Sequence, residues 1–393
     1  MEGWKTYRLE DLTIDGKGHY GIGAPAVDFD ENKFTYLRIT DINDDGSINY
    51  SGLKSVDDPD AKKYILKEGD IVFARTGNST GRSYYYESSD GQFVFAGFLI
   101  KFSLDPAKVN PRFLKYYTHS KAYYEWVQSF DTGATRGNIN AQTYGSMEIK
   151  LPPRAVQNRL VEILSSMDDK IKLNNRINHN LEEQIQERFD SMIISDNGLG
   201  YCQIADFVDV NPKRCLRKNE PAKCVDMSYL STSGPFPSGW ETKGYNGGMK
   251  FVNGDTIMAR ITPCLENGKV AYVNFLDDGE VAFGSTEYIV LHAKEGVAPV
   301  FTYFLARNKN FVDYATKNMN GSSGRQRVSG DTIGKYMIPV IVSDSLNEFS
   351  GFATPAMEVI RNNSFESRFL AATRDALLPL LLSGELSISQ MNC

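Results

Sequence analysis

The stretch GDIVFARTGNSTGR at residues 69–82 has a close counterpart in GDTIMARITPCLENGK at residues 254–269. Both begin with Gly-Asp, continue through three mostly apolar residues to Ala-Arg, and end in a polar, glycine-containing loop with a basic residue. This order is typical of a short buried strand that ends in a turn. We expect Asp70 and Asp255 to stabilise that turn rather than to contact a ligand. The chain is therefore predicted to contain two copies of one domain.

The similarity between the two halves extends well beyond this phrase. Each half has the same succession of a strand, the Gly-Asp phrase, a second strand, an aromatic helix that follows a proline, a second polar loop and a strand that ends in proline. In chain order these segments are residues 35–39, 69–82, 93–100, 111–127, 132–140 and 148–153 in the first half, and 224–228, 254–269, 281–290, 299–314, 320–329 and 335–340 in the second. Each copy is thus predicted to be a compact mixed domain.

After each copy the hydrophobic pattern changes its period. Residues 154–194 contain neither Gly nor Pro, and their apolar residues recur with the 4-3 spacing of one narrow helical stripe. Such a helix would be ~60 Å long and must bury that stripe. A second stripe covers residues 344–382, where Pro355 and Pro379 predict a break or irregular start and a frayed end.

We expect the two long helices to pack against each other, with Asn174, Asn178 and Asn363 at seam positions fixing the register. The alternative is a helical hairpin within an ordinary core. The predicted apolar seam residues are Leu160, Leu164, Met167, Ile171, Leu181, Ile185, Phe349, Ile360, Leu370 and Leu377.

The predicted fold class is therefore α+β, with two mixed α/β domains in a pseudo-two-fold repeat and two long antiparallel coiled-coil helices. The domains are expected at residues 1–152 and 196–342, and the helices at residues 153–195 and 343–393.

Composition predicts a cytoplasmic globular protein. Mean hydropathy is −0.36, the N-terminus is too polar for a signal peptide, and no apolar run has membrane-spanning length. The five cysteines form no CxxC pair, which favours free thiols in a reducing compartment. The net charge of −6 argues mildly against nucleic acid as a partner, but binding depends on where the basic groups lie.

The sequence contains no convincing catalytic, metal or cofactor motif. GKGHYG at residues 16–21 has the letters of a dinucleotide-binding turn, but Ile-Gly-Ala-Pro follows it instead of a helix. Asn211-Pro212 is followed by Lys-Arg and lacks the second proline and the aromatic residue of an amino-methyltransferase motif. The four histidines have no metal-ligand spacing. We therefore expect no catalytic residues, no bound metal and no cofactor.

The polar loops offer the side chains that bind base edges and phosphates. Both copies keep two such loops while the residues within them differ, so two similar scaffolds could read two different sequences. The alternative is that they are ordinary solvated loops. The candidate DNA-binding residues are Arg75, Thr76, Asn78, Ser79, Arg82, Thr135, Arg136, Asn138 and Asn140 in the first half, and Arg260, Thr262, Asn267, Lys269, Ser322, Ser323, Arg325, Gln326 and Arg327 in the second.

Over essentially its whole length the chain resembles the specificity subunits of type I restriction–modification enzymes. The resemblance is carried by LPPRAVQNRLVEIL from residue 151, SMDDKIKLNNRINHNLEEQ from residue 166, LLPLLLSGELSI at 377–388, FTYLRITDINDDGSI at 34–48 and the two Gly-Asp phrases. Two departures concern the helix starts: Arg154-Ala155-Val156 replaces a more acidic stretch, and VIVSDSLNEF lacks a double proline.

The resemblance implies two target-recognition domains, each reading one half of a split site on double-stranded DNA, held apart by the helices. It implies that methylation and cleavage reside in partner subunits: two modification subunits, which carry S-adenosylmethionine, and the restriction subunits. Two other classes remain open: a helical adaptor that binds proteins without direct DNA recognition, and a fused enzyme with a cryptic site.

Overall fold

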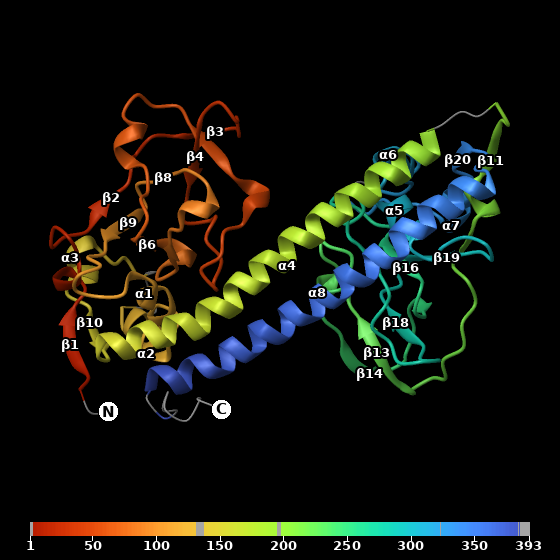
Figure 1. Ribbon diagram of the computed structural model, residues 1–393. Helices are drawn as coiled ribbons and strands as arrows, with labels where there is room; N and C mark the ends of the chain where they lie inside the picture. Colours follow the sequence, from red (N-terminus) through yellow and green to blue (C-terminus); the bar gives the residue numbers. More distant parts are fainter. Residues whose placement is uncertain (1–2, 131–136, 195–197, 323, 384, 386–393) are drawn as a thin grey trace. The chain divides into compact units, whose positions relative to one another are not determined.

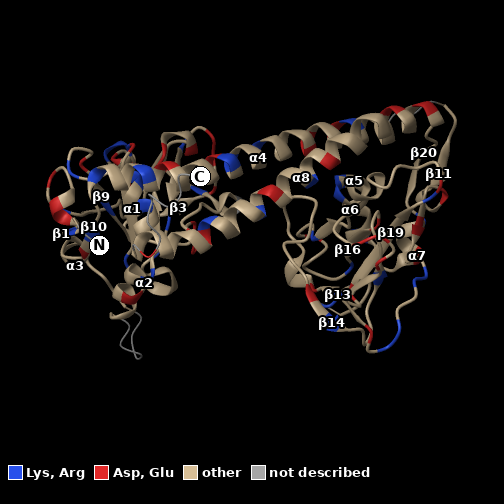
Figure 2. Cartoon of the chain, turned by 60° about the horizontal axis from the view of Figure 1, so that its bottom comes forward, with Lys and Arg blue, Asp and Glu red and all other residues tan. Residues whose placement is uncertain are grey.

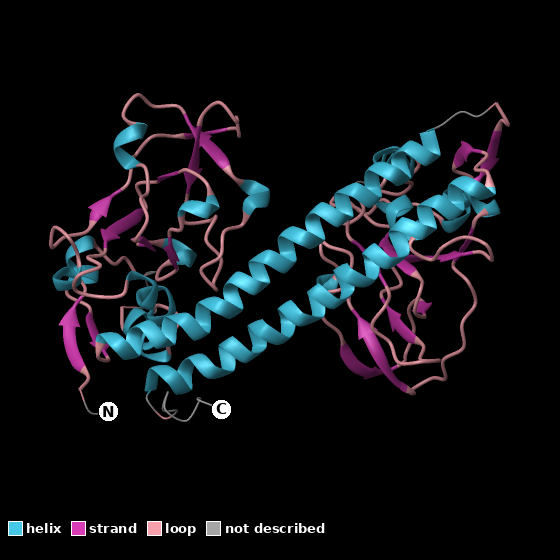
Figure 3. Ribbon diagram, in the orientation of Figure 1, coloured by secondary structure: helices cyan, strands magenta, loops and turns pink. Residues whose placement is uncertain are grey.

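The computed structural model describes residues 3–130, 137–194, 198–322, 324–383 and 385. It divides into two compact units, the first formed by residues 1–169 and 370–393 and the second by residues 170–369. Each unit mixes strands and helices, and two long helices supply a segment to each unit (Figures 1 and 3). The predicted α+β fold class is confirmed.

The first unit contains two four-stranded sheets and one two-stranded sheet. The strand orders are β2-β9-β6-β7, β3-β5-β4-β8 and β1-β10. Its strands are β1 Lys5–Arg8, β2 His19–Tyr20, β3 Ala26–Val27, β4 Phe34–Leu37, β5 Lys54–Val56, β6 Asp70–Ala74, β7 Ser83–Tyr85, β8 Phe93–Phe95, β9 Leu99–Ser103 and β10 Glu148–Leu151. Its short helices are α1 Pro111–Tyr117, α2 Lys121–Gln128 and α3 Ala141–Gly145.

The second unit repeats this plan. The strand orders are β12-β19-β16-β17, β14-β13-β18-β15 and β11-β20, so β16 corresponds to β6. β13 corresponds to β4, because β13 pairs in parallel with β18 as β4 does with β8, whereas the edge strands of this sheet differ between the units. Its strands are β11 Tyr201–Gln203, β12 Val208–Val210, β13 Pro221–Val225, β14 Glu241–Gly244, β15 Lys250–Phe251, β16 Thr256–Ala259, β17 Val270–Tyr272, β18 Ala282–Gly284, β19 Tyr288–Ala293 and β20 Met337–Pro339. Its short helices are α5 Phe301–Arg307, α6 Lys309–Lys317 and α7 Gly330–Gly334.

Several predicted elements are divided in the structure. The predicted strand at residues 93–100 is two strands, because β8 pairs with β4 and β9 pairs with β6 in the other sheet. The predicted helix at residues 111–127 is also two helices, because the Ser120 side chain accepts a hydrogen bond from the Tyr123 N–H and starts α2 anew. Asn308 divides α5 from α6 in the same way, through the Phe311 N–H.

The long helices are α4, Arg154–Ile194, and α8, Ser343–Ser383, each 41 residues long. The expected break or irregular start and the frayed end of the second helix are wrong, because α8 is continuous through Pro355 and Pro379. Both prolines lie on the exposed side of the helix, and Gly351, four residues before Pro355, has no side chain to obstruct the backbone adjustment that a proline needs. Buried neighbours such as Ala353 and Met357 hold the helix in place.

The predicted seam residues differ in burial. In the first unit Leu160 and Leu164 are buried in one core cluster with Leu378 and Leu381 of α8, and in the second unit Ile185 packs in one core cluster with Phe349 and Ile360. Met167, Ile171, Leu181, Leu370 and Leu377 are half-buried. The sequence analysis did not assign Phe189, Leu378 or Leu381 to the seam, although all three are buried.

Asparagines occupy the seam within the second unit. Asn174 donates to Glu366 Oε2 at 2.8 Å, and Asn363 donates to Asn178 Oδ1 at 2.9 Å. The partner of residue 178 on α8 thus has a lower residue number than the partner of residue 174. The two helices therefore run antiparallel there. None of the described helices has an apolar stretch sufficient to span a membrane.

Candidate nucleic-acid interface

Each Gly-Asp phrase places its aspartate in a buried turn. Asp70 Oδ2 accepts a hydrogen bond from the Lys67 N–H at 2.8 Å, and Asp255 Oδ2 accepts one from the Val252 N–H, also at 2.8 Å. The two carboxylates are 2% and 0% exposed, so no ligand in solution reaches them. The predicted structural role of both aspartates is confirmed.

In the first unit, Arg75 directly follows β6 and joins the two polar loops. Its N–H donates to the Phe98 carbonyl at 3.1 Å, and its own carbonyl accepts from the Ile139 N–H at 3.0 Å. The Thr80 hydroxyl donates to the Gly137 carbonyl at 3.0 Å, which makes a second link between the loops. The fold therefore brings together two loops that lie about sixty residues apart in the sequence.

The guanidinium group of Arg75 lies over the ring of Tyr20, 5.1 Å from its centroid, and its Nε is buried without a hydrogen-bond partner. Within the described part of the first unit, no carboxylate forms an ion pair with it. Tyr20 is a residue that the sequence analysis missed, although it belongs to the GKGHYG stretch. Its hydroxyl accepts a hydrogen bond from the Ala141 N–H, so it also contacts the start of α3, directly after the second loop.

Arg260 takes the same place in the second unit. Its N–H donates to the Glu287 carbonyl and its carbonyl accepts from the Val328 N–H, both at 3.0 Å. The Thr262 N–H donates to the Gln326 carbonyl at 3.1 Å, which again links the two loops. Nε of Arg260 is buried without a partner, and no described carboxylate forms an ion pair with its guanidinium group. Positions 75 and 260 are thus equivalent in backbone contacts, and neither guanidinium group forms an ion pair with a described carboxylate, although the charge of Arg260 also helps to lower the pKa of Glu287.

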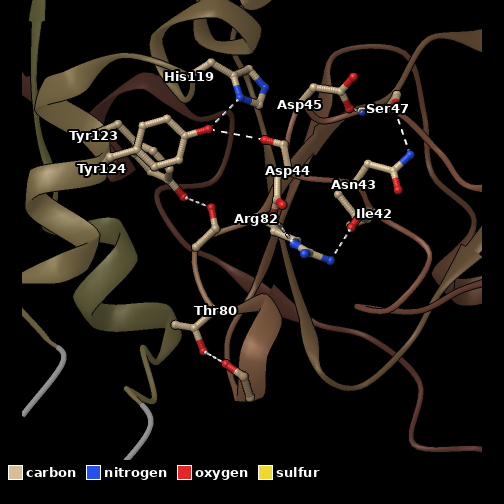
Figure 4. A network of polar contacts seen from close by, with 12 residues as sticks. Ile42, Asn43, Asp44, Asp45, Ser47, Thr80, Arg82, His119, Tyr123 and Tyr124 are labelled. Carbon is tan, nitrogen blue, oxygen red and sulfur yellow. Dashed lines mark hydrogen bonds and ion pairs between the residues drawn. The ribbon is translucent and has the colours of Figure 1, made fainter. Parts of the chain in front are cut away.

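Two of the other candidate arginines are engaged within the protein. Arg82 Nε lies 2.7 Å from Asp44 Oδ1, and its Nη1 donates to the Ile42 carbonyl at 3.0 Å (Figure 4). Arg327 forms a forked pair with Glu287 at 2.8–3.0 Å. The hydrogen bond from Arg327 is the largest influence on Glu287 and lowers the pKa of its carboxyl group. Both arginines therefore use some of their hydrogen-bond donors in contacts within the protein.

The loop that contains Asp44 packs against α2 through a second network. The Tyr124 hydroxyl donates to the Asp44 carbonyl at 3.2 Å and lies 3.2 Å from Nδ1 of His119 (Figure 4). Burial lowers the pKa of His119 to about 4, so the imidazole is neutral at neutral pH. This network has the character of a structural support rather than of a site for general acid–base chemistry.

The remaining candidate residues lie on both loops with different exposure. Asn140 starts α3 by accepting from the Thr143 N–H, and the Lys269 ammonium donates to the Met227 carbonyl. Asn78, Asn138, Asn267, Ser322 and Arg325 are exposed; Thr76, Thr262 and Gln326 are half-buried; Ser79 is buried. Thr135, Arg136 and Ser323 lie outside the described residues. Among the residues that the structure describes, no group of three or more His, Cys, Asp or Glu side chains is arranged to hold a metal ion.

Comparison with known proteins finds similarity to the specificity subunits of type I restriction–modification systems. Residues 1–183 match the model of the type I restriction modification DNA specificity domain. The HindI specificity subunit of Haemophilus influenzae is 20% identical over 98% of this chain and 100% of its own length. The EcoAI specificity subunit of Escherichia coli is 30% identical over 34% of this chain and 23% of its own length. The solved structure of the S subunit of a type I restriction–modification system from M. genitalium covers 96% of both chains with a TM-score of 0.61 at 14% identity, which shows a common fold.

Proposed function

We propose that the chain is the DNA-reading subunit of a type I restriction–modification complex. The match of residues 1–183 to the DNA specificity domain of that family and the full-length similarity to the HindI specificity subunit support this proposal. In this proposal each unit reads one half of a bipartite, asymmetric site on double-stranded DNA. The observation that carries it is the equivalence of Arg75 and Arg260, which occupy the same position of a repeated fold and each have a buried Nε without a hydrogen-bond partner.

Arginine is suited to this task by its chemistry. The guanidinium group presents N–H donors in a fixed fork that matches the O6 and N7 acceptors of guanine and the oxygens of phosphate. A buried Nε without a partner costs free energy unless something completes its hydrogen bonds, and a nucleic-acid acceptor would do so. The neighbours of the two arginines differ: Tyr20 lies beside Arg75, whereas Arg327 is held to Glu287 close to Arg260. Different neighbours on equivalent scaffolds suit two different half-sites.

In this proposal the helices α4 and α8 serve as a scaffold for partner subunits. Two modification subunits, which carry S-adenosylmethionine and perform methylation, would bind this chain, and restriction subunits would join them for cleavage. The chain itself would then be non-catalytic. Since its substrate would be chromosomal or incoming DNA, it would act in the cytoplasm.

Exchange of the part of the first unit that precedes α4 tests the two-part reading directly. We replace residues 1–152 by the corresponding segment of a related specificity subunit and keep the rest of the chain. One half of the methylated site should change to the donor's half-site while the other half stays the same, because each scaffold reads its half independently. Sequencing of methylated positions in DNA from cells that express the complete complex provides the measurement. If both halves change, or neither does, the two-part model is wrong.

The competing function is a helical adaptor that binds proteins and has no contact with DNA. Retention of the assembled complex on DNA separates the two. A reader should bind duplex DNA with an affinity that falls steeply with salt, because phosphate contacts release counterions. An adaptor should show no such dependence.

A further inference from the structure

One connection between strands has opposite net charge in the two units. In the second unit, residues 211–220 join β12 to β13 and contain Lys213, Arg214, Arg217 and Lys218 against one acid, Glu220. The corresponding stretch of the first unit, residues 21–33 between β2 and β4, contains the additional short strand β3 and carries Asp28, Asp30 and Glu31 against one base, Lys33. The same position of the fold is thus basic in one unit and acidic in the other; Figure 2 shows the distribution of charged residues over both units.

The basic connection is anchored to the second unit. Nη2 of Arg214 lies 3.1 Å from the fully buried Asp255 Oδ1, and the Arg214 carbonyl accepts a hydrogen bond from Lys250 Nζ at 3.1 Å. Leu216 packs against the small apolar cluster that contains Cys224 and Phe283. The contacts of Arg214 and Leu216 therefore hold the backbone of this segment against the rest of the second unit.

The exposed cations of the segment have no carboxylate partners. Lys213, Arg217 and Lys218 are exposed, and no ion pair involves them within the described residues. Glu220, the one acid of the connection, bonds to the backbone: its Oε2 accepts a hydrogen bond from the Arg217 N–H at 2.8 Å. The fold thus presents three positive charges on a fixed backbone and leaves them unneutralised.

The segment begins beside the candidate interface. A Cβ atom added to Gly330 would lie 2.6 Å from Nδ2 of Asn211, so these two residues are in close contact. Gly330 directly follows the second polar loop of this unit, residues 320–329, whose Val328 contacts the carbonyl of Arg260. The first residue of the segment therefore lies beside the second polar loop, whereas Arg214 pairs with Asp255 directly before β16 and Arg260 directly follows the other end of that strand.

We propose that Lys213, Arg217 and Lys218 bind DNA phosphates, as a sequence-independent contact that only the second unit makes. The proposal rests on the proposed function and extends it. Exposed, long cationic side chains without partners fix a protein on the DNA backbone but do not by themselves read bases. The acidic connection of the first unit would repel phosphates at the equivalent position. The two units would then hold DNA with unequal strength, and the second would contribute more of the salt dependence.

The test is the salt dependence of DNA binding by the assembled complex. The variant Lys213→Gln/Arg217→Gln/Lys218→Gln should bind every duplex more weakly, and the slope of log affinity against log salt should become shallower by about 2 to 3, since each phosphate contact contributes about 0.9. The methylated sequence should not change. The charge-preserving variant Lys213→Arg/Arg217→Lys/Lys218→Arg should retain the wild-type slope.

A matched control is available in the first unit. Lys17, Lys62 and Lys150 are also exposed and form no ion pair within the described residues, so their replacement by Gln removes the same charge from scattered positions. This control should keep the wild-type slope. An unchanged slope in the first triple variant, while the wild type still binds its site specifically, overturns this inference alone. Loss of partner subunits from that variant at an unchanged slope would assign the segment to a protein interface and overturn it too. Failure of the wild-type complex to prefer any DNA sequence would refute the proposed function instead.

Discussion

Replacement of Asp168 by alanine should destabilise the first unit by about 3 kcal/mol, the lower end of the range for a broken buried ion pair. Asp168 is 7% exposed and accepts from Arg374 Nη1 at 2.7 Å and from the Tyr116 hydroxyl at 2.9 Å. Lys115 Nζ lies 3.0 Å away. The carboxylate thus joins α1, α4 and α8 within one unit. Its removal leaves Lys115 without its carboxylate partner and leaves Arg374 with Asp375 alone. Denaturant unfolding of the full chain gives the free-energy difference.

Asp169 provides the control for this variant. It is the next residue on α4, is exposed and forms no ion pair within the described residues. Asp169→Ala should change the free energy of unfolding by no more than about 0.5 kcal/mol, as is usual for surface positions. Equal stability of the two alanine variants would contradict a structural role for the Asp168 contacts.

The stabilisation by Asp168 should also depend on pH. Burial alone would raise the pKa of this carboxyl group, but the charges and hydrogen bonds of Lys115 and Arg374 outweigh burial and lower it. A lowered pKa in the folded state means that the stabilisation is complete above the unfolded value, about 4, and is lost as pH falls through the folded value. The difference between wild type and Asp168→Ala should therefore be constant near neutral pH and shrink below about pH 4.

Replacement of either Arg75 or Arg260 by alanine should weaken binding of the cognate DNA by about 1–3 kcal/mol, or roughly 5- to 150-fold. Each variant should relax the sequence preference in one half of the site only, because each arginine belongs to one unit. Competition binding with duplexes that vary one half-site at a time provides the measurement. The outcome that contradicts the assignment is an unchanged preference in both halves for both variants.

Lysine at the same positions separates charge from geometry. Arg75→Lys and Arg260→Lys keep the positive charge but lose the forked donor arrangement. Overall affinity for DNA should fall less than in the alanine variants, whereas discrimination at one base position should still be lost. If lysine restores full discrimination, these arginines contact phosphates and do not read bases.

The sequence alone determined the features that depend on neighbours a few residues away. The repeated Gly-Asp phrases, with Asp70 and Asp255 in buried turns, follow from local turn chemistry. The long helix after the first domain follows from a 4-3 spacing without Gly or Pro. These patterns are periodic and local, so a single sequence contains all the information that they need.

The tertiary structure decided what depends on residues that are distant in the sequence. Local propensity does not show that residues 93–100 change from one sheet to another, that α8 is continuous through two prolines, or that Tyr20 lies under Arg75. In the sequence all the loop arginines are equivalent cations. Packing distinguishes them, because it brings Asp44 to Arg82 and Glu287 to Arg327 across about forty residues and leaves the guanidinium groups of Arg75 and Arg260 without an ion pair to a described carboxylate. Whether a charge is neutralised is set by which distant side chain the fold places beside it.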